Sequence, residues 1–392
     1  MTSDVATPET RAWVLHPELT SDRDRRAAAP SLEEAVSLAA ALPGLKVVGQ
    51  EVVPLPKARA GQLFGPGKID ELGERFHDED VDLVLIDGPV SPVQQRNLER
   101  DWKTKILDRT GLILEIFSDR AATREGVLQV EMAALSYQRT RLVRAWTHLE
   151  RQRGGLGFVG GPGETQIEAD RRAIDEQLVR LRRQLEKVVK TRSLHRAARA
   201  KVPYPIVALV GYTNAGKSTL FNRLTGAKVL AKDMLFASID PTMRALTLPD
   251  GPDIILSDTV GFISDLPTQL VAAFRATLEE VLSADLIVHV RDISHPESEE
   301  QAENVETILA ELGVSEDTAR IEVWNKIDQL DPESDASVRA RAARQDDVIL
   351  ASALSGEGMS SFQDHVIQCL LPDRVETEIL IPFSDDRQRA WL

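Results

Sequence analysis

The sequence predicts an α/β protein whose C-terminal part folds as a doubly wound, mostly parallel sheet, and three observations carry that prediction. The chain has 392 residues, too many for one ordinary core, so we expect two or three domains. After Pro203, short apolar runs alternate with helix-like stretches, as in a parallel sheet flanked by helices. Before that point lie a smaller stretch of similar texture and two long series of helically spaced apolar residues.

Composition excludes several classes of protein. Hydrophobic residues make up 42% and charged residues 28% of the chain, which is typical of folded proteins and excludes wholesale disorder. Cys369 is the single cysteine, so an internal disulfide is excluded and a reducing, cytoplasmic location is expected. No apolar run approaches the roughly 18 residues that span a bilayer, and Asp4 and Glu9 stand where a signal peptide needs apolar residues. We therefore expect no membrane span.

The N-terminal part divides into three segments. Residues 1–35 lack periodicity, and we interpret them as a mobile leader without chemistry. Residues 36–125 form a small α/β domain, in which residues 81–86 read as a buried strand. Residues 126–200 form a two-helix hairpin, because apolar residues recur there at spacings of three, four or seven. The two series are Leu128, Met132, Leu135, Leu142, Trp146 and Leu149, then Ile174, Leu178, Leu181, Leu185 and Val188.

The connection between the two helices of the hairpin is rich in glycine. Six glycines between residues 154 and 163 exclude a helix there, and a flexible connector is one interpretation. The connection is longer than the roughly two to eight residues that antiparallel helices need, so we favour a tip, carrying Phe158, built for close approach to a partner.

Charge is segregated along the chain. The net charge is −15, which argues against a polyanionic partner, yet residues 139–201 hold sixteen Lys or Arg against seven Asp or Glu. Either this stretch is a solvated helix face, or it is an electrostatic footprint for a phosphate backbone.

A phosphate-binding loop follows the first expected strand of the C-terminal part. We expect strands at residues 206–210, 254–256, 286–290, 321–324 and 348–350, with ligands at their carboxyl ends. GYTNAGKS, residues 211–218, lies between a strand and a helix, so its amides would wrap phosphates, Lys217 would neutralise them and Ser218 would ligate Mg²⁺. The residues predicted to bind nucleotide here are Gly211, Tyr212, Thr213, Asn214, Ala215, Gly216, Lys217, Ser218 and Thr219.

Two further motifs predict guanine as the base. NKID, residues 325–328, follows a strand, and Asp328 can accept hydrogen bonds from the guanine ring N–H and exocyclic amine, whereas adenine would leave the carboxylate unpaired. SAL follows another strand and would close over the base. The predicted contacts are Asn325, Lys326, Asp328, Ser352, Ala353 and Leu354.

DTVGF, residues 258–262, predicts a segment that senses the third phosphate. Asp258 would hold the metal through water, Thr259 and Val260 would line the site, and the Gly261 amide would sense the γ-phosphate. Ras-like proteins follow this glycine with a glutamine that orients water, but here Phe262 has no polar group. We hypothesise that Asn214 helps hold K⁺ instead, and we assign the catalytic roles to Lys217, Asn214 and Gly261.

A second switch is predicted at residues 235–242. It must supply a hydroxyl to the Mg²⁺ shell, and Ser238 and Thr242 both qualify. The predicted nucleotide contacts of this segment are Phe236, Ala237, Ser238, Ile239 and Asp240.

With these motifs in hand, the sequence resembles the HflX family of ribosome-associated GTPases over most of its length. The resemblance rests on the GTP motifs and on four further segments: GPGK at 65–68, SPVQQRNLE at 91–99, LDRTGLILEIF at 107–117 and GGLGFVGGPGETQIEADRR at 154–172. It implies an N-terminal α/β domain with a helical hairpin, followed by a Ras-like P-loop G domain, here residues 201–372. Similarity to the Obg-type pattern F-x-T-L-x-P places the switch hydroxyl, and with Ser218 the metal, on Ser238.

The resemblance also implies a function. Members of this family bind the large ribosomal subunit, with the tip on ribosomal RNA near the peptidyl transferase region, and separate the subunits of stalled ribosomes; some also hydrolyse ATP. We therefore predict a monomeric, cytoplasmic GTPase that uses Mg²⁺, takes GTP and GDP, and is stimulated by ribosomes. The predicted RNA contacts are Arg153, Gly155, Phe158, Arg171, Arg172, Arg180, Arg182 and Arg183.

The sequence leaves two alternative functions open. A GTPase acting in ribosome assembly or on another RNA is one alternative, and an RNA-binding protein whose nucleotide only stabilises the fold is another. The family usually continues into a small C-terminal domain, and we expect residues 373–392 to be the start of a truncated one.

Overall fold

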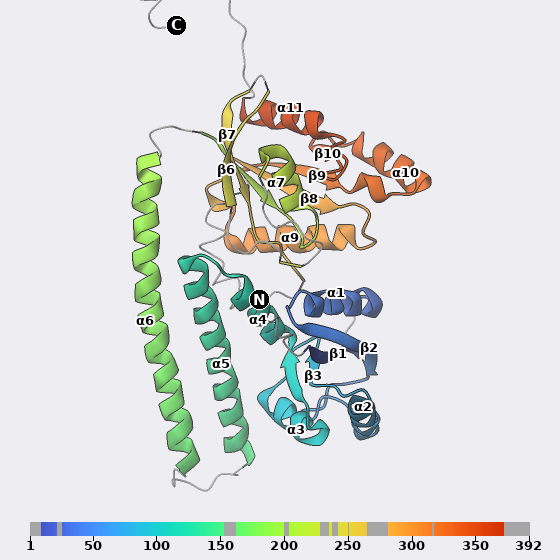
Figure 1. Ribbon diagram of the computed structural model, residues 1–392, viewed down its shortest axis with the longest axis vertical. Helices are drawn as coiled ribbons and strands as arrows, with labels where there is room; N and C mark the ends of the chain where they lie inside the picture. Colours follow the sequence, from blue (N-terminus) through green and yellow to red (C-terminus); the bar gives the residue numbers. More distant parts are fainter. Residues whose placement is uncertain are drawn as a thin grey trace, which may run out of the picture.

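The predicted α/β architecture is confirmed in a computed structural model of the chain (Figure 1). An N-terminal sheet domain and a C-terminal sheet domain lie one above the other, and a long helical hairpin runs beside both. The structure describes residues 9–21, 26–152, 162–199, 204–227, 235–236, 242–249, 251–264, 281–315 and 317–371.

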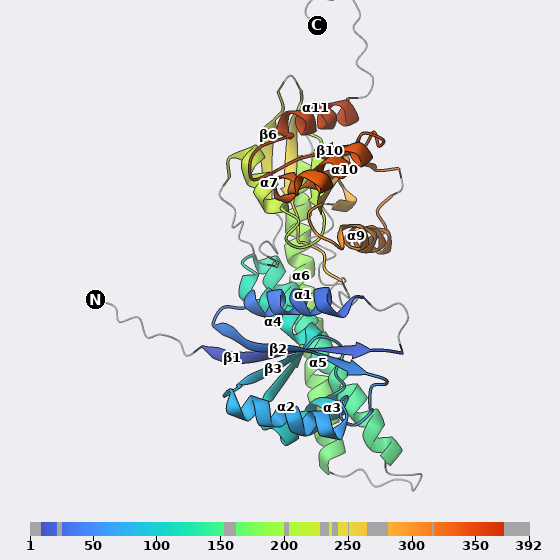
Figure 2. The same ribbon diagram turned by 90° about the vertical axis from the view of Figure 1, so that its right-hand side faces the viewer.

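The N-terminal domain is a four-stranded parallel sheet covered by helices on both faces. Its strands run in the order β2-β1-β3-β4. Helices α1 and α4 cover the face that is turned toward the C-terminal domain, and α2 and α3 cover the opposite face (Figure 2). The elements are β1 (Thr10–Leu19), α1 (Ala28–Ala40), β2 (Leu45–Leu55), α2 (Pro66–Asp78), β3 (Leu83–Ile86), α3 (Pro92–Trp102), β4 (Lys105–Asp108) and α4 (Arg109–Arg120).

The interpretation of residues 1–35 as a mobile leader is wrong for the strand and helix found there. β1 is an interior strand that pairs with β2 and β3, and α1 starts at Ala28. The apolar run of β1 is short, with Ala12, Val14 and Leu15 buried on both faces, so neither a period of two nor one of 3.6 is visible in the sequence.

The predicted hairpin consists of α5 (Arg124–Gln152) and α6 (Pro162–Arg199), which pack side by side. Leu128, Leu178 and Leu181 of the two apolar series are buried, as their spacing predicts. The tip residues Arg153, Gly155 and Phe158 lie outside the described part of the chain.

The C-terminal domain is a six-stranded sheet in the order β10-β9-β8-β5-β7-β6, parallel except for β6. The five predicted strands are all present, and the edge strand β6 escapes prediction because each of its residues is half-buried or exposed. Helices α7 and α11 pack on one face and α9 on the other. The elements are β5 (Ile206–Val210), α7 (Lys217–Thr225), β6 (Thr242–Thr247), β7 (Asp253–Asp258), β8 (Leu286–Asp292), α9 (Ser298–Leu312), β9 (Ala319–Asn325), a 3₁₀ turn (Ile327–Gln329), α10 (Pro332–Ala342), β10 (Val348–Leu350) and α11 (Met359–Leu370).

The two domains share one apolar core. A single cluster of buried side chains runs from Phe117 of α4 through Phe236 and Phe262 to Ile308 of α9. Burial of this continuous surface fixes the domains against each other. No helix in the described part of the chain combines the length and the apolar composition needed to cross a bilayer.

Candidate nucleotide site

The phosphate loop is held in a shape that only glycine permits at two positions. Gly211 has φ +147° and Gly216 has φ +96°. A Cβ on Gly211 would lie 2.1 Å from the carbonyl oxygen of Val290, and one on Gly216 would lie 2.2 Å from the Asn325 side-chain nitrogen. The loop is therefore pressed against the ends of β8 and β9, and its amides precede the N-terminus of α7, where anions bind.

Lys217 is buried at the start of α7. Its Nζ donates to the carbonyl oxygens of Gly211 at 3.0 Å and Tyr212 at 2.7 Å. Burial lowers the pKa of Lys217 to about 8, against the opposing effect of the negative charge of Asp258. Anionic phosphates bound beside Lys217 would therefore stabilise its charged form.

Ser218 and Asp258 meet where the metal is expected. Ser218 Oγ donates to Asp258 Oδ2 at 2.7 Å, and Asp258 is fully buried at the end of β7. Hydroxyl and carboxylate oxygens are the donors that Mg²⁺ prefers, so the pair fits this ion. The expected third group, Ser238, lies outside the described residues, and Thr242 is the first residue of β6 and pairs with Asp258.

Asn325 connects the phosphate loop to the expected base loop. Its Nδ2 donates to the Ala215 carbonyl at 2.8 Å, and its Oδ1 accepts from the Ala353 amide at 2.9 Å. Lys326 pairs with Asp292 at 2.7 Å, while Asp328 is exposed. The Asp328 carboxylate, which is expected to bind guanine, is therefore accessible to a ligand. The hydrogen bonds of Asn325 hold the neighbouring loops in place.

Arg223 is a residue of this site that sequence reasoning missed. Its Nε donates to the Ala353 carbonyl at 2.6 Å, and its guanidinium also donates to the carbonyl of Leu354. Leu354 is 71% exposed, so the arginine holds the loop from its inner side and leaves the outer side free. Nothing in its sequence position, on the helix after the phosphate loop, signals this contact.

The segment 258–262 packs directly against the phosphate loop. Phe262 donates its amide to the Gly211 carbonyl at 3.1 Å and accepts from the Thr213 amide at 2.7 Å. A Cβ on Gly261 would lie 2.8 Å from Thr213 Cα and 3.0 Å from Lys217 Nζ. The ring of Phe262 is buried in the shared core, so it does not replace a water-orienting glutamine.

The other predicted nucleotide contacts fall into three groups. The hydroxyl of Thr259 donates to the Leu209 carbonyl at 2.6 Å, and Val260 is buried, so both side chains support the segment. Thr213 is buried, and its Oγ1 has no hydrogen-bond partner among the described residues. Ala237, Ser238, Ile239 and Asp240 lie outside the described residues.

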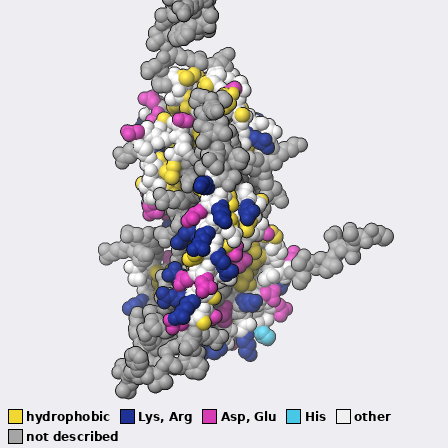
Figure 3. Space-filling model, turned by 90° about the vertical axis from the view of Figure 1, so that its left-hand side faces the viewer, with side chains coloured by type: hydrophobic (Ala, Val, Ile, Leu, Met, Phe, Trp, Pro, Cys, Tyr) yellow, Lys and Arg dark blue, Asp and Glu magenta, His cyan; other side chains and the backbone are white. Residues whose placement is uncertain are grey.

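The cationic face of α6 carries part of the predicted RNA site. Arg171 and Arg172 are engaged by Asp175 at 4.0 Å and Glu168 at 3.0 Å. Arg180, Arg182 and Arg183 are exposed, and within the described part of the chain they have no ion-pair partner. Figure 3 shows Lys and Arg side chains gathered along this side of the molecule, with Asp and Glu among them.

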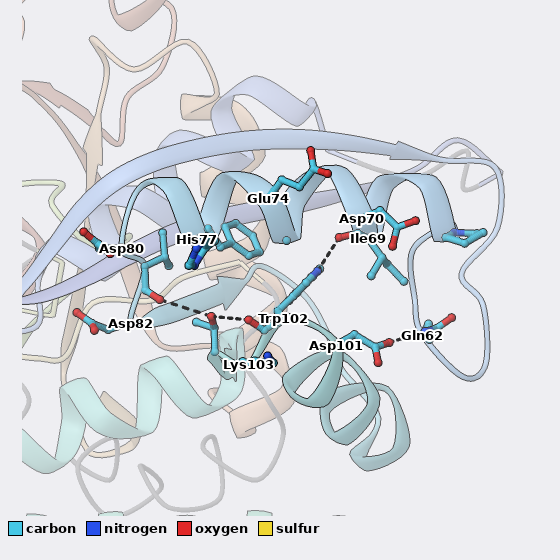
Figure 4. Close-up of a pocket in the computed structure, with 15 residues that line it drawn as sticks. Gln62, Ile69, Asp70, Glu74, His77, Asp80, Asp82, Asp101, Trp102 and Lys103 are labelled. Carbon is cyan, nitrogen blue, oxygen red and sulfur yellow. Dashed lines mark hydrogen bonds between the residues drawn. The ribbon is translucent and has the colours of Figure 1, made fainter.

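A hollow in the N-terminal domain has several acidic side chains in its lining, in contrast to the cationic face of α6. It has a volume of about 830 Å³ and lies between α2 and α3, where Trp102 donates to the Ile69 carbonyl at 2.9 Å (Figure 4). Its lining includes the carboxylates of Asp70, Glu74, Asp80, Asp82 and Asp101. Such a surface repels polyphosphates, so the phosphate loop remains the candidate nucleotide site.

Three family models together match most of the chain. Residues 29–118 match a GTP-binding GTPase N-terminal region, residues 120–199 a GTP-binding GTPase middle region, and residues 206–326 a 50S ribosome-binding GTPase domain.

Curated proteins named GTPase HflX resemble nearly the whole chain. The protein of Magnetococcus marinus is 50% identical over 96% of this chain and 85% of its own length. The protein of Escherichia coli is 43% identical over 97% of this chain and 87% of its own length. Among solved structures, a GTP-binding protein of Sulfolobus solfataricus in complex with GDP is 24% identical and covers 93% of this chain and 99% of that one, with a TM-score of 0.48.

Proposed function

Because the chain belongs to the HflX family of GTPases and is a GTP hydrolase, we propose that it binds the large ribosomal subunit and separates the subunits of stalled ribosomes in a GTP-dependent way. One observation carries the proposal. A guanine-nucleotide site and an arm with an exposed arginine cluster, Arg180, Arg182 and Arg183, belong to one chain whose net charge is −15. An acidic protein that concentrates exposed arginines on one arm is suited to touch a polyanion there and nowhere else.

At the nucleotide site, contacts of the described residues support the roles proposed for Lys217, Gly261, Ser218 and Asp258. Lys217 neutralises the β- and γ-phosphates, and the Gly261 amide binds the γ-phosphate; a Cβ on Gly261 would lie 3.0 Å from Lys217 Nζ, so the two residues lie side by side. Ser218 and Asp258, which are hydrogen-bonded at 2.7 Å, would hold Mg²⁺ together with Ser238, Asp258 acting through water. When bound, the ion neutralises charge that develops on the phosphates.

The buried ring of Phe262 leaves hydrolysis without a side chain that orients water, so a helper is needed. Asn214 has φ +61° and lies at the exposed rim of the phosphate loop. Its carbonyl oxygen helps to hold a monovalent cation, which takes the place of an arginine finger. Turnover in potassium should exceed turnover in sodium at equal ionic strength. Equal rates in the two salts would remove Asn214 from this role.

The arm supplies the second half of the proposed function. Arg153, Gly155 and Phe158 at the tip, with Arg171, Arg172 and the exposed arginine cluster, contact ribosomal RNA in the cytoplasm. Phosphate contacts of this kind release counterions, so binding weakens as salt rises.

The test is GTP turnover with and without purified large subunits. We expect at least tenfold stimulation, since the missing catalytic group is supplied by the ribosome on this account. Turnover that large subunits leave unchanged would contradict the proposal. Stimulation by free structured RNA alone would favour a GTPase acting on another RNA.

A further inference from the structure

Helix α4 of the N-terminal domain touches both nucleotide-sensing segments of the C-terminal domain. We name residues 235–242 the first switch and residues 258–264 the second switch. We propose that α4, through Arg109 at one end and Phe117 and Arg120 at the other, positions both switches, so that the choice between GDP and GTP is coupled to the position of the N-terminal domain. This inference rests on the GTP dependence proposed above and names the residues that transmit it.

The first end of α4 holds the second switch by its backbone. Arg109 donates through Nη2 to the carbonyl oxygen of Ser264 at 2.9 Å. Ser264 comes three residues after Gly261, the residue expected to meet the γ-phosphate. A shift of Gly261 is therefore transmitted to a hydrogen bond that belongs to the other domain.

The phosphate loop joins the same network through Tyr212. Its phenol oxygen accepts from the Ser264 amide at 2.8 Å, lies 2.7 Å from Ser264 Oγ, and donates to the carboxylate of Glu34 in α1. Burial and the charge of Glu34 raise the pKa of Tyr212, so the phenol keeps its proton. Tyr212 thus links the phosphate loop, the second switch and the N-terminal domain.

The charges of this network are buried and mutually compensated. Arg109 is 7% exposed and pairs with Asp87 at 2.7 Å and also with Glu34, which are 6% and 10% exposed. Burial alone would raise the pKa of Asp87, but a hydrogen bond from His16 and the charge of Arg109 hold it below its usual range. Buried pairs of this kind have few alternative arrangements, because an unpaired partner is costly. They favour discrete positions over gradual sliding.

The other end of α4 holds Phe236, which lies in the described start of the first switch. The rings of Phe117 and Phe236 meet edge to face with centroids 4.7 Å apart. Arg120 donates to the Phe236 carbonyl at 3.2 Å and to the Ala41 carbonyl at 2.7 Å. One rigid helix of twelve residues therefore connects the two switches.

The coupling acts on the choice between the two nucleotides, because only GTP has the phosphate that Gly261 is expected to bind. A γ-phosphate held by the Gly261 amide would fix the backbone that leads to Ser264, whose carbonyl and amide are held by Arg109 and Tyr212. Loss of these contacts should therefore change the affinity for GTP more than the affinity for GDP.

The experiment compares affinities for GDP and a non-hydrolysable GTP analogue in the full-length protein without ribosomes. Arg109→Lys keeps the charge but loses the planar fork that serves three acceptors, and Phe117→Leu removes the ring contact. We expect the ratio of the analogue Kd to the GDP Kd to change at least fivefold in each variant. The matched control is Arg75→Lys. Arg75 lies on α2, on the face of the N-terminal sheet opposite to α4, and it pairs with Glu51 and Glu71.

A ratio within twofold of wild type in both variants would overturn the proposal, as would an equal change in the control. Hydrogen exchange on the unaltered protein gives a second test that needs no variant. Amides of α4 should differ in protection between the GDP and analogue complexes, and identical protection would contradict the coupling. Since ribosomes are absent, failure of ribosome binding leaves these outcomes unaffected, and the two proposals fail separately.

Discussion

Nucleotide binding should be accompanied by the uptake of a proton at Lys217, and the affinity for nucleotide should therefore depend on pH. Lys217 is buried, and burial lowers its pKa to about 8. Phosphates that meet this group favour its charged form, so the pKa rises when nucleotide binds. Affinity is therefore full well below pH 8 and falls as the pH rises through 8.

The magnitude follows from the pKa. At pH 8 about half of the free protein carries a neutral lysine, so binding should take up about half a proton per nucleotide. At pH 7 the uptake falls to about a tenth of a proton, and the dissociation constant should rise about tenfold between pH 7 and pH 9. Asp258 holds the pKa up, so Asp258→Asn should increase the uptake at pH 8 toward one proton.

Titration calorimetry of GDP binding in buffers of different ionisation enthalpy measures this uptake directly. Measuring at pH 8 keeps the guanine ring proton and the phosphates in one ionisation state. No uptake at pH 8, or an uptake that Asp258→Asn leaves unchanged, would refute the reasoning that places the phosphates against Lys217.

Three further predictions concern the base and the arm. Asp328→Asn should shift base preference from guanine toward xanthine, because a carboxamide both donates and accepts; competition by GTP and XTP measures it, and an unaltered preference for GTP would count against the role of Asp328. Arg223→Ala should weaken GDP and GTP binding equally, by about tenfold, because it frees the loop over the base and not the phosphates; unequal losses would argue against that support. Reversing Arg180, Arg182 and Arg183 to glutamate should weaken binding to large subunits and flatten its salt dependence, and unchanged binding would move the contact elsewhere.

Local patterns predicted much of this molecule. The phosphate loop, the NKID segment and the five strands of the C-terminal sheet follow from sequence alone, because each combines a turn, an apolar run and a fixed spacing. The apolar series of the hairpin likewise predicted that Leu178 and Leu181 are buried.

Contacts between distant segments could not be predicted in this way. The sequence does not predict β1, because an interior strand buried on both faces has a short apolar run without alternation. Arg109 and Glu34 meet Tyr212 and Ser264 across the domain interface, and a single sequence carries no signal for pairs so far apart. Arg223 was missed for the same reason, since its partners lie more than a hundred residues away.

The central claim is that a third phosphate governs the grip of the arm on ribosomal RNA. Co-sedimentation with isolated large subunits, using the protein without nucleotide, with GDP and with a non-hydrolysable GTP analogue, tests it most directly. We expect the analogue complex to bind at least tenfold more tightly than the other two. Equal binding in all three states would contradict the claim.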